Sequence, residues 1–76
     1  MTVYIIEKIT YDDVIRHGIF LSEKSAKKKL KALFNQEKND TLHTPEWIDH
    51  RSFGLYDKND SFEYGRFEIN EAHVEP

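Results

Sequence analysis

The segment Ser22–Phe34, SEKSAKKKLKALF, decides the fold because it carries a clear helical period. Four of its apolar residues recur at intervals of four, three and one positions, which places them on one stripe of an amphipathic helix. They are Ala26, Leu30, Leu33 and Phe34. Ser22 is a suitable N-cap, and Glu23 favours the positive end of the helix dipole. Asn39-Asp40 supplies stop signals, so we predict a helix that ends near Lys38.

The same segment raises a question of charge, since it holds five lysines and one glutamate in a chain of net charge -3. Residues 39–76 hold nine acidic residues against three basic ones. Nucleic-acid-binding domains usually have a net basic charge with arginines, and this helix has no arginine. We therefore interpret the lysines as a solvated helix face, with nucleic-acid binding as the alternative. A membrane-surface helix is disfavoured because the apolar stripe is needed for the core.

Length and composition predict one folded domain over residues 1–76. Aromatic residues make up 13% of the chain, which disordered chains usually lack. The chain has no cysteine, so neither disulfides nor cysteine-based metal sites are expected. No signal peptide and no apolar run of membrane-spanning length are visible, and we expect a cytoplasmic protein.

Before the helix, β-branched and aromatic residues predict two strands, Thr2–Thr10 and Val14–Leu21. The polar turn Tyr11–Asp13 between them is short, which favours an antiparallel hairpin. Apolar residues occur on both faces of the first strand. Val3, Ile5 and Ile9 share one face, and Tyr4 and Ile6 share the other. Gly18, inside the second strand, indicates a bulge or a close backbone approach.

After the helix, Thr41–Glu46 is predicted to be a loop because it contains a proline. Strand character resumes at Trp47–Tyr56, and Asp57–Asp60 is a turn. A final strand is predicted over Ser61–Val74. Its apolar residues change parity, which either a bulge near Asn70-Glu71 or the start of a tail there explains. The predicted order is β-β-α-β-β: an α+β fold with one amphipathic helix packed on a small antiparallel sheet.

Short motifs along the chain resemble an uncharacterised family of small bacterial and phage proteins. The family pattern is a strand with Val-Tyr, a Gly-x-Phe-x-Ser helix start and a closing Phe-x-Ile-x-Glu strand. The matching positions are Val3, Tyr4, Gly18, Phe20, Ser22, Lys24, Ala26, Lys27, Phe67, Ile69 and Glu71. Ser25 departs from the pattern, and residues 45–56 have no counterpart in it. The resemblance implies an α+β fold and an origin in a phage or another mobile element, and it implies no activity.

Catalytic chemistry has little support in this sequence. There is no cysteine nucleophile, no Gly-rich phosphate loop and no Gly-x-Ser-x-Gly elbow. His43 and His50 bracket Glu46 and Asp49, but this spacing matches no familiar metal motif. We therefore predict no enzymatic activity, no cofactor and no metal site.

The aromatic residues of the second half favour a role in protein recognition. Trp and Tyr are preferred interface anchors when part of the ring is exposed. We expect Trp47 to be such an anchor, unless it closes the core. The remaining residues of the expected partner-binding set are Asp49, His50 and Arg51 as a polar rim, and Tyr56, Phe62 and Tyr64 as further aromatics. The acidic residues of the second half offer another binding surface, although solubility and protection of an edge strand explain them better.

The expected function is that of a non-enzymatic protein-interaction module that binds and modulates or inhibits a larger protein. A homodimer is a further possibility, and a nucleic-acid-associated accessory protein is the alternative. Neither the partner nor the pathway can be read from the sequence.

The helical stripe generates the first prediction. Leu30→Ala should lower the free energy of unfolding by roughly 2–5 kcal/mol, because it leaves a cavity in the core. Lys28→Ala, on the solvated face, should be nearly neutral. Chemical denaturation of both variants measures the difference, and equal effects would refute the assignment of the two faces.

Overall fold

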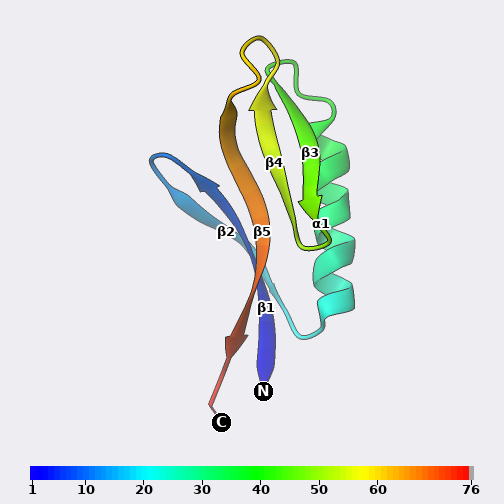
Figure 1. Cartoon of the computed structure of the whole chain (residues 1–76). Coiled ribbons are helices and arrows are strands. Elements are labelled where there is room, and N and C mark those ends of the chain that lie inside the picture. Colours follow the sequence, from blue (N-terminus) through cyan, green and yellow to red (C-terminus); the bar gives the residue numbers. More distant parts are fainter. Residues whose placement is uncertain (76) are drawn as a thin grey trace.

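One helix lies against one face of a five-stranded antiparallel sheet in the computed structural model, which describes residues 1–75 (Figure 1). The elements are β1 (Thr2–Thr10), β2 (Val14–Phe20), α1 (Glu23–Glu37), β3 (His43–Asp49), β4 (Ser52–Asp57) and β5 (Glu63–His73). The predicted class, one amphipathic helix packed on a small antiparallel sheet, is confirmed. The sheet has one strand more than predicted, and this strand follows the helix.

The strand order is β2-β1-β5-β4-β3, so the two central strands are β1 and β5. Hairpins join β1 to β2, β3 to β4 and β4 to β5. Helix α1 is the crossover that connects one edge of the sheet, β2, with the other edge, β3. Met1 and Val74 lie side by side just before β1 and just after β5, where the amide of Val74 donates to the carbonyl of Met1 at 2.7 Å.

The hydrophobic core lies between α1 and the sheet. The helix contributes Ala26, Leu30 and Leu33, with Phe34 half-buried beside them, as predicted. The strands contribute Ile6, Phe53, Leu55, Phe67 and Ile69. Ser22 caps the helix as expected, because its hydroxyl accepts from the amide of Ser25 at 3.1 Å. A 15-residue helix is about 22 Å long, whereas the molecule extends 47 Å, so part of the sheet has no helix over it.

The hairpin of β1 and β2 contains a bulge, which one of the two interpretations of Gly18 predicted. Ile6 pairs with Gly18 and the next residue, Glu7, pairs with Arg16, so His17 is the additional residue. Gly18 has φ +142°, a conformation that residues with a Cβ rarely adopt. A Cβ at this position would lie 2.8 Å from the ring of Phe20. The bulge therefore needs glycine both for its backbone and for the packing of Phe20.

The predictions for residues 41–56 were wrong in two respects. The expected loop Thr41–Glu46 is largely β3, and the expected single strand Trp47–Tyr56 contains the tight turn between β3 and β4. Pro45 suggested a loop, but proline is tolerated in an edge strand, and β3 is an edge. The turn at residues 50–51 contains no Gly, Pro or Asn, which are the residues that usually indicate a turn. The amide of Arg51 in this turn donates to the side chain of Asp49 instead.

The bulge near Asn70-Glu71, one of the two predicted explanations for the change of parity, is absent. Strand β5 pairs with β1 in unbroken register from His73 opposite Thr2 to Gly65 opposite Thr10. The change of parity arises because β5 has apolar residues on both faces. Phe67 and Ile69 belong to the core under the helix, whereas Ala72 pairs with Val3 on the other face.

The bulge generates the second prediction. Gly18→Ala should lower the free energy of unfolding by roughly 1–3 kcal/mol, because alanine is strained at this φ and its methyl group collides with Phe20. Arg16→Ala, on the same exposed strand, is the control and should be nearly neutral. Urea denaturation measures both variants, and indistinguishable midpoints would show that the bulge does not depend on glycine.

Candidate protein-binding surface

The residues expected to bind a partner do not converge on one site. The structure distributes them over three places. Trp47 lies on edge strand β3 on the helix side of the sheet; Asp49, His50 and Arg51 form the turn between β3 and β4; Tyr56, Phe62 and Tyr64 lie around β4 and the start of β5. Each group therefore has to be assessed separately.

Trp47 is held firmly and yet remains accessible. Its ring stacks on Phe34 of α1, with centroids 4.6 Å apart and an angle of 13° between the planes. It also meets Phe53 of β4 in an edge-to-face contact at 5.5 Å. In spite of these contacts, 46% of the residue is exposed. An aromatic side chain that is fixed on one side and open on the other loses little conformational entropy when it binds a partner.

The neighbours of Trp47 extend this feature into a small surface. The ammonium of Lys38, just after α1, lies 5.2 Å from the ring centroid of Phe34, which is within the range of a cation–π contact. We call Trp47, Phe34 and Lys38 the Trp47 surface. It combines an exposed aromatic anchor with a cation, and both are located where an edge strand meets a helix.

Asp49 has a structural role in the turn, and the predicted polar rim of Asp49 and His50 stays a prediction. The carboxylate of Asp49 accepts from the amide of Arg51 at 2.8 Å and from the hydroxyl of Ser52 at 2.9 Å. These hydrogen bonds hold the pKa of Asp49 below its ordinary value of 3.8. Asp49 thus shapes the turn, and His50 lies exposed at its tip.

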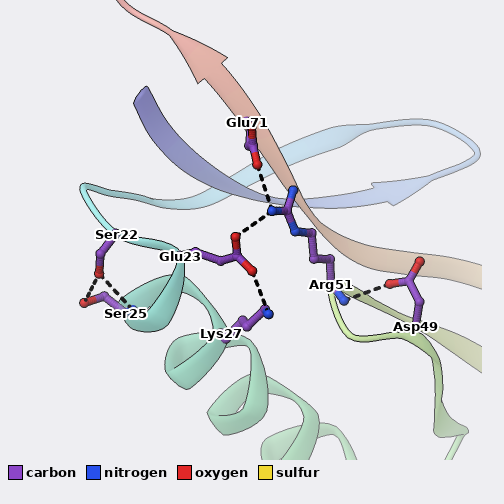
Figure 2. A network of polar contacts seen from close by, with 7 residues as sticks. All are labelled: Ser22, Glu23, Ser25, Lys27, Asp49, Arg51 and Glu71. Carbon is purple, nitrogen blue, oxygen red and sulfur yellow. Dashed lines mark hydrogen bonds and ion pairs between the residues drawn. The ribbon is translucent and has the colours of Figure 1, made fainter. Parts of the chain in front are cut away.

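Arg51 joins three elements through its guanidinium (Figure 2). Its Nη2 lies 2.6 Å from Glu23 at the start of α1 and 2.7 Å from Glu71 on β5. Lys27 completes the network at 2.6 Å from the other oxygen of Glu23. The guanidinium also lies 5.9 Å from the ring centroid of Tyr4. Arg51 therefore anchors the helix to the sheet, and its predicted role in a polar rim stays a prediction.

The pKa values of this network follow from its geometry. Hydrogen bonds from Lys27 and then Arg51 lower the pKa of Glu23 below 4.5. Hydrogen bonds to Glu71 and then Glu23 raise the pKa of Arg51. The pairing of Glu23 with Lys27 has the i,i+4 spacing that a sequence reveals. The contacts of Arg51 link residues 28 and 20 positions apart, and no sequence signal announces them.

The other predicted aromatics make separate local contacts. Tyr56 packs against Gly54, where a Cβ would lie 2.8 Å from its ring. Phe62 stacks on Tyr11 at 5.9 Å. Tyr64 stacks on His43 at 4.4 Å. These contacts close the end of the sheet that extends beyond the helix, and they do not join the Trp47 surface.

The described residues show no arrangement typical of a reaction centre. Within residues 1–75, no three His, Asp or Glu side chains gather in a way that could hold a metal ion. A hollow of about 220 Å³ lies between the end of β1 and β5. Two of its lining residues, Glu63 and Arg66, are paired with each other at 2.9 Å.

Comparisons with known proteins give no information on function, so the functional proposal is based on this geometry. No protein-family model, no curated protein and no solved structure matches the chain. The resemblance to small bacterial and phage proteins thus stays a prediction. Among residues 1–75, no helix has the length and apolar character needed to cross a membrane.

The Arg51 network generates the third prediction. In a double-mutant cycle of Glu23→Gln and Arg51→Met, the coupling between the two sites should be favourable at pH 7. Because the pKa of Glu23 is lowered by folding, this contribution is present above the unfolded-state pKa and is lost as the pH falls through the lower folded-state value. The coupling, measured by thermal unfolding, should therefore disappear between about pH 5 and pH 2.

The control for this cycle is the second surface pair, Glu63 and Arg66. Glu63 lies far along the sheet from the contact of Glu23 with Arg51. The variant Glu63→Gln should therefore leave the coupling of Glu23 with Arg51 unchanged. A coupling that is zero at pH 7, or that persists fully in acid, would contradict the proposed anchoring role.

Proposed function

We propose that this protein binds a larger protein partner and modulates or inhibits it without catalysing a reaction. The observation that supports this proposal is Trp47, a residue type preferred at interface hot spots, which is half-exposed while its ring is stacked on Phe34. Its position on an edge strand lets a partner approach without displacing the helix. The cysteine-free composition favours a reducing compartment such as the cytoplasm.

A second copy of the chain is another occupant of the Trp47 surface. The size of the surface favours a larger partner, because a stable interface buries about 800 Å² on each side and the Trp47 surface is only its centre. An origin in a phage or another mobile element rests on the family resemblance alone. It would fit a small protein that acts by occupying a surface of a host protein.

Nucleic-acid binding is the weaker alternative for the lysines of α1. Lys27 is already paired with Glu23, and the chain as a whole has a net charge of -3. A binder of phosphates gains affinity from each cation that it places near the backbone, and it loses affinity to its own acidic surface. We therefore do not propose nucleic acid as the partner.

The fourth prediction tests the Trp47 surface directly. A photo-crosslinking amino acid in place of Lys38 should capture the partner in cells of the source organism. The same amino acid in place of Tyr11, which is exposed in the turn between β1 and β2 and is separated from β3 by the central strands, should not. With the purified partner, Trp47→Ser should weaken binding by about 2 kcal/mol or more. Since Trp47 is the one tryptophan of the chain, acrylamide quenching of its fluorescence should decrease on binding.

Trp47→Ser also removes the ring contacts with Phe34 and Phe53, so the fold of this variant must be checked by circular dichroism. Trp47→Phe retains a ring that can stack on Phe34, and its binding should fall between wild type and serine. Equal capture from both crosslinking positions would contradict the proposal. Capture of RNA or DNA from the position of Lys38 would favour the nucleic-acid alternative.

A further inference from the structure

The two edges of the sheet are protected differently against pairing with another strand. Edge strand β3 carries Pro45, which has no amide to donate, and the acidic residues Glu46 and Asp49. Proline and charge are common means of blocking an edge. Edge strand β2 has neither proline nor carboxylate, and its charged residue is Arg16. Three of its apolar residues are about half exposed: Val14 55%, Ile15 47% and Ile19 53%.

A groove lies beside the lower part of β2, between this strand and α1. It has a volume of about 320 Å³. Its lining residues are Phe20 from the strand and Ser25, Lys28, Lys29 and Ala32 from the helix. Residues spaced by four and three positions, as in the helical series 25, 29 and 32, lie in one row along a helix. The groove thus follows one flank of α1, and Gly18 leaves room for the ring of Phe20 that lines it.

The polar rim of the groove is basic. Lys28 and Lys29 are exposed and take part in no ion pair among residues 1–75. The carboxylate of Glu23 is occupied by Lys27 and Arg51 (Figure 2). The rim therefore presents positive charge that no neighbouring carboxylate neutralises, next to an apolar hollow.

We propose that this groove, together with residues 18–20 of β2, binds an extended acidic peptide segment of another protein by strand addition. The main chain of the segment pairs with the open edge of β2, as in other complexes in which a peptide extends a sheet beside a helix. Alternate apolar side chains enter the hollow above Phe20, and carboxylates of the segment pair with Lys28 and Lys29. The bulge at His17 interrupts the edge, so the paired stretch is short.

This β2–α1 groove is separate from the Trp47 surface. Phe34 faces Trp47 of β3 from one flank of α1, whereas Ala32 lines the groove beside β2, at the opposite edge of the sheet. The two sites can therefore be occupied or lost independently, and the groove does not depend on the function proposed for Trp47.

A second copy of the chain fits the groove less well than an acidic peptide. Antiparallel pairing of two β2 edges about a twofold axis perpendicular to the sheet would bring two copies of Arg16, Lys28 and Lys29 toward each other, and like charges oppose such an approach. The bulge would also interrupt the pairing in both copies. A nucleic acid would use the lysines but would leave the open main-chain groups of β2 without partners.

The experiment is selection from a displayed library of random octapeptides against the folded protein. The selected sequences should be enriched in Asp and Glu that alternate with apolar residues. Fluorescence anisotropy of a selected, labelled peptide then gives its affinity. The double variant Lys28→Glu/Lys29→Glu should weaken binding at least about tenfold, since it reverses the charge of the rim.

The matched control is Lys24→Glu/Lys31→Glu, which makes the same change of charge on exposed positions of the same helix that do not line the groove. It should weaken binding less than about threefold, because those charges act only at a distance. Amide shifts in a ¹⁵N spectrum should be largest at Ile19 and Phe20. Trp47→Ser should not alter the affinity, which separates this site from the Trp47 surface.

Several outcomes would overturn the proposal. These are a selection that yields no binder or only basic peptides, equal effects of the two double variants, and amide shifts centred on Trp47. A single-stranded oligonucleotide that binds more tightly than the peptide and depends on the same two lysines would assign the groove to nucleic acid. A concentration-dependent dimer in sedimentation, lost with Lys28→Glu/Lys29→Glu, would assign it to a second copy.

Discussion

The packing of one helical stripe against one face of the sheet is the contact on which the rest of the structure depends. Ala26, Leu30 and Leu33 supply the helical side, and Phe53 and Phe67 supply much of the opposing side. The chain has no disulfide, so this core is the main source of its stability. A small domain buries a modest share of its surface. Each large side chain in the core therefore contributes a large part of the stability of the fold.

Because the single helix is too short to cover the whole sheet, aromatic side chains cover part of the sheet instead. A helix of 15 residues does not reach the ends of a molecule that extends 47 Å. Aromatic rings cover part of the remaining sheet: Tyr64 stacks on His43 at 4.4 Å, and His17 contacts the core residue Phe67 at 5.1 Å. Aromatic side chains suit this task because each buries a large area and also tolerates partial exposure. Trp47 covers the edge of the sheet in the same way and remains partly exposed.

Polar contacts then determine where the helix sits. Arg51 draws the first turn of α1 toward β5 through Glu23 and Glu71. With the N-terminal end of the helix held in this way, one flank faces β3 and Trp47, and the other faces β2 and Phe20. The two flanks differ in chemistry, and so do the two edges of the sheet. A single crossover helix thus creates both surfaces for which we propose binding.

The sequence by itself determined the elements whose signals are local. The apolar period and the cap at Ser22 predicted α1, and β-branched and aromatic residues between turn residues predicted β1, β2 and β5, because these patterns depend on neighbours within a few positions. The sequence did not predict the stack of Trp47 on Phe34, and the role of Trp47 as an anchor stays a prediction.

Only the tertiary structure decided the features that depend on distant residues. It made Pro45 part of an edge strand, since the cost of proline in a strand depends on whether another strand pairs there. It also made Arg51 an anchor between α1 and β5, because its partners are 28 and 20 positions away. It also created the groove between Phe20 and Ala32, which exists only where strand and helix meet. The contacts that shape a binding surface arise between elements, and no local pattern records them.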